Sequence, residues 1–221
     1  MKQPILITGC ARSGTSMVAG IMHKCGAFGG RTTGPTHWNK RGQYENDEIR
    51  ENVIKPYLVL HGADPKGQYP LPDPTALMPV ENLADKIHSI MKWHGYKGNR
   101  PWYYKGAKLT LIWSLWHAAF PKAKWLIVRR PDADIVSSCM HTAYMNNRDT
   151  EESWQEWVEH HKTQFAAMSA AGLDMVEVWP DKFMEGNFQT LAEFVRGVGL
   201  YWNDKTVRAF VSKDLWGKHH G

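Results

Sequence analysis

The stretch that decides the fold lies near the N-terminus and reads Ile5-Leu6-Ile7-Thr8-Gly9-Cys10-Ala11-Arg12-Ser13-Gly14-Thr15-Ser16. Its apolar start predicts a buried strand, and the apolar pattern of residues 13–25 predicts a helix directly after the loop. Gly9 and Gly14 have the G-x4-G spacing of a P-loop, in which backbone N–H groups and the helix N-terminus bind a phosphate. The sequence therefore predicts a strand, a glycine loop and a helix that together bind an anion.

The loop differs from that of nucleoside triphosphatases at the positions that contact the triphosphate in those proteins. A triphosphatase has Lys and then Ser or Thr after the second glycine, whereas this chain has Thr15 and Ser16. The only cation in the loop is Arg12, whose guanidinium can hold a phosphate oxygen in a fork. The alternative is a tight strand-to-helix turn with a surface arginine. We expect the loop to bind a phosphorylated ligand through Gly9, Arg12, Ser13, Gly14, Thr15 and Ser16.

Three more apolar segments predict buried strands, at residues 102–105, 125–129 and 175–179. Helical patterns occur at residues 45–60, 81–93, 109–120, 134–145, 153–171, 188–198 and 205–211, and residues 62–79 form a Pro/Gly-rich loop. Strands that alternate with helices predict an α/β fold of three layers, with a mostly parallel sheet flanked by helices. Ligands of such folds bind at the carboxyl ends of the strands, which directs attention to the residues after each strand.

Composition narrows the class of protein. The chain has 221 residues, 43% of them hydrophobic and 22% charged, which excludes wholesale disorder and favours one domain over residues 1–221. No apolar run approaches the roughly 20 residues of a membrane helix, and the first is too short for a signal-peptide core, so we expect a soluble, cytoplasmic protein. The three cysteines have no CxxC spacing, which disfavours a disulfide framework or a zinc site.

The chain is basic, with a formal net charge of +5. Lysine and arginine are scattered and form no run of five or six, so we expect no nucleic-acid partner. A moderate positive field instead favours an anionic small ligand.

The third predicted strand ends in Arg129-Arg130-Pro131-Asp132-Ala133-Asp134-Ile135-Val136-Ser137-Ser138. A triphosphatase usually has Asp at such a strand end to hold Mg²⁺. Two arginines repel a metal ion and attract a second anionic group, so the sequence predicts two anion sites at neighbouring strand ends and no metal site. A nucleotide with phosphates at two separate positions fits this pattern better than ATP does.

These residues carry a resemblance to a known family. Residues 9–16 resemble the 5′-phosphosulfate loop of the sulfotransferases that use 3′-phosphoadenosine 5′-phosphosulfate (PAPS). Residues 130–138 resemble their 3′-phosphate motif, an Arg at a strand end with a Ser eight residues later. Residues 105–130 and 178–200 are similar to the family's connecting helix and strand and to its late strand, loop and helix. In length the chain resembles the compact bacterial or phage members.

The resemblance implies a P-loop-like sulfotransferase fold and the transfer of a sulfuryl group from PAPS to a hydroxyl or amine. It implies a small-molecule or glycan acceptor of unknown identity, bound in part by an insert at residues 30–100, with no membrane and no metal required. Trp179 stands where the family often places an aromatic ring against adenine. The family's Gly-rich basic loop near the C-terminus is absent, although Lys213 and Lys218 could substitute. Two alternatives are a P-loop phosphotransferase and a nucleotide-binding protein without catalysis.

The 3′-phosphate motif can be read in two registers, Arg129 with Ser137 or Arg130 with Ser138. The first keeps Pro131 at its frequent second position. The second aligns residues 134–136 with the helix start, and we favour it.

Sulfuryl transfer needs a base for the acceptor proton and cations on the leaving phosphate. Arg12 and Lys105 are the expected cations, and Ala107 replaces the catalytic histidine of the family's cytosolic branch. Glu45 is the first choice of base, because residues 42–45 resemble a Gly-aromatic-Glu segment that faces the acceptor. We expect this carboxylate to have a raised pKa, and the alternative is a capping role at its helix. His37 is the second choice, with an ordinary loop histidine as the alternative.

Overall fold

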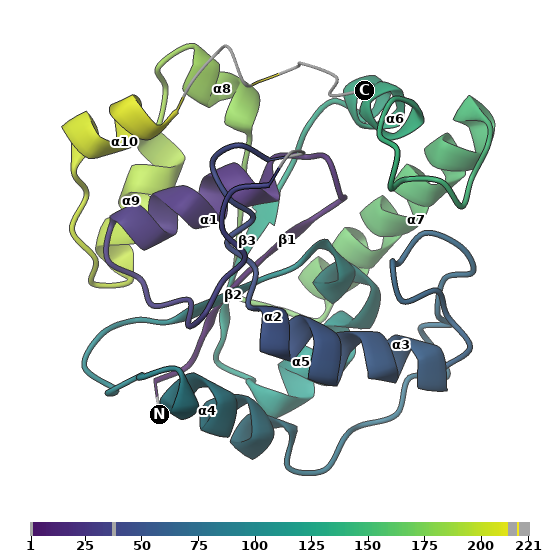
Figure 1. The fold of residues 1–221 in the computed structure, drawn as a ribbon, viewed down its shortest axis with the longest axis horizontal. Helices are drawn as coiled ribbons and strands as arrows, with labels where there is room; N and C mark the ends of the chain where they lie inside the picture. Colours follow the sequence, from purple (N-terminus) through teal and green to yellow (C-terminus); the bar gives the residue numbers. More distant parts are fainter. Residues whose placement is uncertain (1, 37–38, 212–215, 217–221) are drawn as a thin grey trace.

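The computed structural model describes residues 2–36, 39–211 and 216. In this part of the chain four parallel strands form a sheet in the order β2-β1-β3-β4, with β1 (Ile5–Gly9), β2 (Tyr103–Lys105), β3 (Lys124–Val128) and β4 (Met175–Val178). The carboxyl ends of all four strands therefore meet at one edge (Figure 1). The predicted parallel α/β fold is confirmed, and each predicted strand is present within one residue at either end.

The helices of the described residues fall largely where the hydrophobic pattern places them. In chain order they are α1 (Thr15–Lys24), α2 (Asp47–Ile49), α3 (Lys55–Leu60), α4 (Leu83–Trp93), α5 (Trp113–Ala119), α6 (Asp132–Met140), α7 (Glu151–Ala170), α8 (Pro180–Met184), α9 (Gln189–Gly197) and α10 (Asp204–Phe210). A π-helical stretch, Arg50–Ile54, joins α2 to α3, and a 3-10 stretch, Ala107–Ile112, precedes α5. No pattern predicts α8, because its five residues are too few to show a helical period.

Two local bonds explain where the helices depart from their expected form. Asn52 lies in the π-helical stretch, and Pro56 has no N–H to donate to its carbonyl. This carbonyl instead accepts a bond of 3.0 Å from Lys86 Nζ of α4. α6 ends at Met140, five residues before its predicted end, and the Thr142 hydroxyl just beyond it donates to the Ser138 carbonyl at 2.6 Å. Such side-chain bonds compete with the regular backbone pattern.

Alternating side chains on the strands divide the core into two clusters, one on each face of the sheet. Leu6 and Trp125 pack with buried residues of α4, α5 and α7, whereas Ile7 and Leu126 pack with those of α1, α9 and α10. This alternation is the two-residue period of a strand, and burial of both faces is typical of parallel sheets. The result is the predicted arrangement of three layers, helix, sheet and helix (Figure 1).

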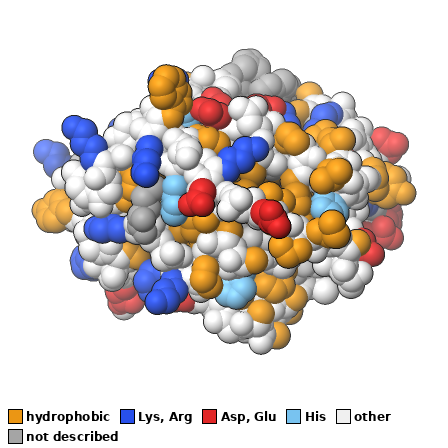
Figure 2. All heavy atoms as spheres, turned by 90° about the horizontal axis from the view of Figure 1, so that it is seen from below, with side chains coloured by type: hydrophobic (Ala, Val, Ile, Leu, Met, Phe, Trp, Pro, Cys, Tyr) orange, Lys and Arg blue, Asp and Glu red, His pale blue; other side chains and the backbone are white. Residues whose placement is uncertain are grey.

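The surface carries mixed charge. On the face in Figure 2, lysine and arginine side chains lie mostly toward the left, and exposed hydrophobic side chains are more frequent toward the right, with acidic side chains among both. In the described part of the chain, none of the helices is long and apolar enough to cross a membrane.

Candidate active site

The loop after β1 has a shape that its glycines permit. A Cβ on Gly9 would lie 2.3 Å from the Val128 carbonyl oxygen of β3, so this position accepts no side chain without moving the strands apart. Arg12 and Gly14 both have positive φ, 72° and 96°, and Gly14 is the N-cap of α1. The buried Ser13 hydroxyl donates to the Cys10 carbonyl at 2.8 Å, which closes the turn. The N-terminus of α1 therefore faces the space above the sheet edge, where the first N–H groups of a helix are able to bind an anion.

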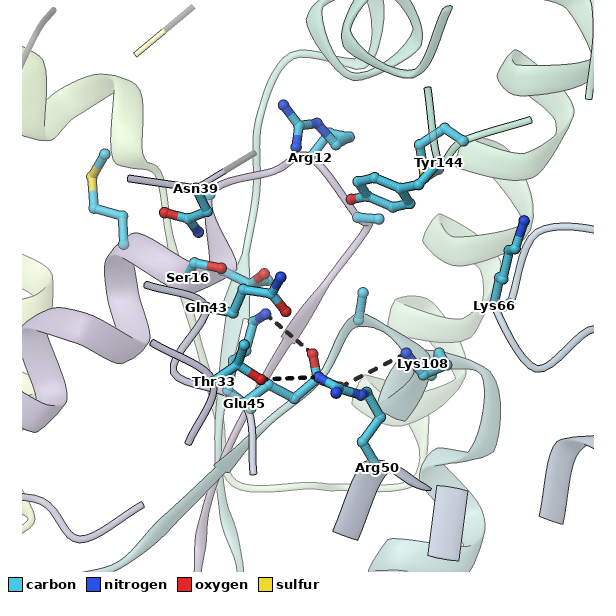
Figure 3. A pocket seen from close by; sticks show the side chains of 18 of the residues that line it. Arg12, Ser16, Thr33, Asn39, Gln43, Glu45, Arg50, Lys66, Lys108 and Tyr144 are labelled. Atoms are coloured by element: carbon cyan, nitrogen blue, oxygen red, sulfur yellow. Dashed lines mark hydrogen bonds and ion pairs between the residues drawn. The ribbon is translucent and has the colours of Figure 1, made fainter. Parts of the chain in front are cut away.

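A cavity of about 560 Å³ lies above this edge. Its lining includes Arg12, Gly14, Thr15 and Ser16 from the loop after β1 and the start of α1. Figure 3 shows Arg12 and Ser16 among the side chains that surround it. Three of the expected phosphate-binding side chains are thus brought to one space with the backbone of Gly14.

The exit of β3 meets the same loop. Arg12 Nε donates to Ser138 Oγ of α6 at 3.0 Å, and Arg130 Nη1 donates to the Arg12 carbonyl at 3.1 Å. Arg130 and Ser138 both line the cavity. The Arg130 guanidinium also lies over the ring of Trp216, 4.7 Å from its centroid. The two predicted anion sites are therefore joined by direct hydrogen bonds.

Arg129, the arginine of the other possible register, makes its contacts away from the cavity. Arg129 Nη1 pairs with Glu177 Oε1 of β4 at 2.7 Å, and its guanidinium lies over the rings of Phe165 and Trp179, 5.1 and 5.6 Å from their centroids. Arg129, Ser137 and Trp179 are not among the described residues that line the cavity.

The end of β2 brings two lysines to one carboxylate. Glu45 is 6% exposed. Its Oε2 lies 3.5 Å from Lys105 Nζ, and its Oε1 lies 3.7 Å from Lys108 Nζ. The hydroxyl of Tyr104 donates to Glu45 Oε1 at 3.5 Å. Figure 3 shows Glu45 at the base of the cavity, with Arg50 and Lys108 beside it. Glu45, Lys105 and Lys108 all line the cavity.

This charge arrangement corrects the expectation about the Glu45 pKa. Burial by itself raises the pKa of this carboxyl, but Lys108, Lys105 and Arg50 together outweigh burial and hold the pKa below its ordinary value. The expected raised pKa is wrong, and Glu45 is an ionised carboxylate at neutral pH. Burial lowers the pKa of the Lys105 ammonium, although the Glu45 charge opposes the shift.

Glu45 does not cap its helix. The N-cap of α2 is Asn46, whose Oδ1 accepts a bond of 3.1 Å from the Ile49 N–H. The Asn46 amide also donates to the Gly29 carbonyl at 3.1 Å, which ties the helix start to the loop before it. The capping task is thus taken by the next residue, and the Glu45 side chain is left to face the lysines. His37, the second candidate base, lies outside the described residues, as do Lys213 and Lys218.

Several lining residues escaped sequence reasoning because they come from separate segments without a local motif. They are Thr33, Asn39, Gln43, Arg50, Lys66, Lys108, Tyr144, Trp157 and His161. Two of them had a signal: Lys108 follows Lys105 by three residues at a strand exit, and Gln43 lies in the segment at residues 42–45. The buried His161 ring is neutral, because burial lowers its pKa to about 3, and its Nδ1–H donates to the Trp157 carbonyl at 2.8 Å. Among the described residues, no group of three His, Cys, Asp or Glu side chains could hold a metal ion.

Comparison with known proteins places this geometry in a family. The model of the sulfotransferase family matches residues 4–194, which is most of the chain. The chain belongs to the sulfotransferase family. The match includes both strand-end loops and the Glu45 segment. The sulfotransferase activity is the one that the two predicted anion sites favour, whereas the acceptor is not specified by the family.

Among the similar solved structures, the first described here shows the same fold. The sulfotransferase domain of the olefin synthase from Synechococcus PCC 7002 is 16% identical, with a TM-score of 0.55 over 98% of this chain and 80% of that one. Sulfotransferase STF1 from Mycobacterium tuberculosis H37Rv is 16% identical, with a TM-score of 0.47 over 95% and 71% of the two chains. Retinol dehydratase in a complex with retinol and PAP is 11% identical, with a TM-score of 0.44 over 95% and 64%. No curated protein matches this sulfotransferase.

Proposed function

We propose that this sulfotransferase transfers a sulfuryl group from PAPS to a hydroxyl of a small acceptor. The observation that carries the proposal is the direct bonding of the two anion sites, in which Arg12 bonds to Ser138 and Arg130 bonds to the Arg12 backbone. Two anion sites in one cavity fit a nucleotide that is charged at two separate positions. Bound PAPS supplies the sulfuryl group and leaves as adenosine 3′,5′-bisphosphate.

The residues present fit this donor. Arg130 Nε is buried and has no hydrogen-bond partner among the described residues, and the Asp134 carboxylate lies 3.7 Å from it. A buried donor without an acceptor is costly, and a phosphate oxygen would satisfy it. We assign the 3′-phosphate to Arg130 and Ser138, and the 5′-phosphosulfate to Arg12, Thr15 and Ser16 with the loop N–H groups after Gly9 and Gly14.

Glu45 is the proposed base. Its ionised carboxylate lies in the same cavity as Arg12 and takes the proton of the acceptor hydroxyl as the new bond from oxygen to sulfur forms. Lys105, 3.5 Å from Glu45, neutralises charge that develops on the phosphate oxygen as the old bond breaks. A lowered pKa makes Glu45 a weaker base, but it keeps the carboxylate deprotonated over the whole neutral range.

The acceptor side of the cavity is built mainly from the segment at residues 30–100. Thr33, Glu45, Arg50 and Lys66 of this segment line the cavity, and Figure 3 shows the first three across from Arg12. We propose that this segment is the acceptor-binding part of a single domain over residues 1–221.

Calorimetric titration tests the donor. Adenosine 3′,5′-bisphosphate should bind more tightly than 5′-AMP, and EDTA should leave its affinity unchanged, because arginines and not carboxylates follow β3. Tighter binding of ATP with Mg²⁺ than of the bisphosphate would favour a phosphotransferase instead. Mass spectrometry of reactions with PAPS and a panel of hydroxyl compounds then measures transfer directly.

A further inference from the structure

The cavity carries more positive charge than its donor half uses. In the strand order β2-β1-β3-β4, the proposed 3′-phosphate site follows β3 and the 5′ site follows β1. The nucleotide therefore extends from β1 toward β3. Lys66 and Lys108 line the same cavity on the other side of β1, beyond the end of β2. Figure 3 shows both lysines on the opposite side of the cavity from Ser16 and Asn39.

The positive charges on this side differ in how far they are neutralised. Arg50 pairs with Asp47 and Glu51, and Lys55 pairs with Glu51, each at 2.8 Å. These two cations are therefore satisfied within the protein.

Lys66 and Lys108 are not neutralised in this way. Lys108 shares the single carboxylate of Glu45 with Lys105, so without the nucleotide this group of three side chains carries a net positive charge. Lys66 Nζ donates to the neutral amide oxygen of Asn146 at 2.8 Å and pairs with no carboxylate among the described residues.

Both lysines are held in place by the backbone around Gly67. A Cβ on Gly67 would lie 3.0 Å from Lys108 Cγ, so the Lys108 stem packs directly on this glycine. The Gly67 carbonyl accepts a bond of 2.9 Å from Trp157 Nε1. The Asp64 carboxylate accepts bonds of 2.9 Å from the N–H groups of Lys66 and Gln68, which fixes the turn. The negative charge of Asp64 is thus directed at backbone N–H groups behind the cavity wall.

The wall beside the lysines is apolar. Leu111, Met145 and Trp157 line the cavity there, together with the neutral His161. Leu111, Met145 and Trp157 belong to one hydrophobic cluster. A ligand on this side meets uncompensated positive charge at one end and an apolar surface along its body.

We propose that the acceptor of this sulfotransferase is a small hydroxylated acid. Its carboxylate or phosphate binds Lys66 and Lys108, its apolar body packs on Leu111, Met145 and Trp157, and its hydroxyl faces Glu45. The inference rests on the proposed function, because it takes the donor to fill the β1–β3 half of the cavity. An anion bound here pairs with the positive charge that the single Glu45 carboxylate leaves uncompensated.

The test compares matched acids and amides. Binding to the full chain, saturated with adenosine 3′,5′-bisphosphate, is measured by calorimetry for 4-hydroxyphenylacetate against 4-hydroxyphenylacetamide and for 6-hydroxyhexanoate against its amide. At low salt we expect at least one acid to bind about fivefold or more tightly than its amide, with the difference shrinking in 0.5 M salt (~4 Å screening length). If neither acid binds more tightly than its amide, the proposal is wrong.

Variants locate the anion contact. Lys66→Met should weaken binding of the acid about three- to tenfold and leave the amide unchanged, since a partly exposed ion pair is worth less than a buried one. Lys97→Met, an exposed lysine outside the cavity lining, is the matched control and should change neither. Lys108→Met should weaken acid binding as well, and thermal unfolding checks that each variant is folded.

Two outcomes separate this inference from the proposed function. If Lys66→Met weakens binding of adenosine 3′,5′-bisphosphate itself, the lysine belongs to the donor site and the anionic acceptor is rejected. If the bisphosphate fails to bind the wild-type protein, the proposed donor is rejected. In that case the comparison of acid with amide in the nucleotide-free protein still decides whether the cavity selects anions.

Discussion

The proposed donor half and the proposed acceptor half of the cavity are built in different ways. The donor half consists of two strand exits, where glycines, a helix N-terminus and short side chains set the geometry within a few residues of each strand. The acceptor half consists of long charged side chains from segments far apart in the chain, such as Lys66, Glu45 and Lys108, which meet only in the folded protein. The difference teaches that a loop whose geometry is set by the backbone is specified by a few neighbouring residues. The position of a cluster of long side chains depends instead on the whole fold.

The largest expected effect concerns the acceptor half. Glu45→Gln removes the proposed base, so kcat should fall about 10²- to 10⁴-fold while the Kd of adenosine 3′,5′-bisphosphate stays nearly unchanged. Steady-state kinetics and calorimetry on the same preparation measure both. Glu48→Gln, which alters a nearby carboxylate that pairs with His94 at 2.8 Å, is the matched control and should retain kcat. Full activity in Glu45→Gln together with collapse in His37→Ala would transfer the role to His37.

The next effect concerns the donor half. Arg130→Ala should weaken adenosine 3′,5′-bisphosphate by about 1.5–3 kcal/mol, the usual value of a charge-assisted hydrogen bond, and should hardly affect 5′-AMP. Arg129→Ala is the control, because Arg129 pairs with Glu177 away from the cavity lining. An equal loss for both nucleotides would leave Arg130 with only a structural role, and an effect from Arg129→Ala alone would favour the other register.

A smaller effect tests how the acceptor half is held together. Asn46→Ala removes the N-cap of α2 and the bond to the Gly29 carbonyl, so the free energy of unfolding should fall by about 0.5–2 kcal/mol. Urea unfolding measures the change. Asn203→Ala removes the equivalent N-cap of α10, and it should cost a similar amount while leaving acceptor KM unchanged. If Asn46→Ala also leaves acceptor KM unchanged, the helix start does not position Glu45.

The smallest expected effect is a nearly flat pH profile. The pKa of Glu45 lies below its ordinary value of 4.5, so the carboxylate stays ionised as the pH falls from neutrality and protonates only below that value. The stability that its ion pairs contribute is present above pH 4.5 and is lost as the pH falls through the lowered pKa. The acid side of kcat/KM should therefore change less than about threefold between pH 7.5 and pH 5.5. A fall centred near pH 6.5 would indicate a histidine base.

The amino-acid sequence by itself determined the parallel α/β fold and the four strands, and it predicted two anion sites at the strand ends. It could do so because a buried strand followed by glycine or arginine is a contiguous pattern, and the carboxyl ends of parallel strands must share one edge. It left the 3′-phosphate motif in two registers, because Arg129 and Arg130 are adjacent and the sequence does not show which of the two side chains faces the cavity. The structure turns Arg130 to the cavity and Arg129 to Glu177.

Only the tertiary structure decided the electrostatics of Glu45 and the composition of the acceptor half. The pKa of a buried carboxyl depends on which charges lie within a few ångströms, and Lys105 and Lys108 approach Glu45 from 60 or more residues away in the chain. Sequence reasoning could not place these lysines beside Glu45, and so expected the opposite shift. Local patterns specify backbone, but long side chains from distant segments acquire neighbours only when the chain is packed.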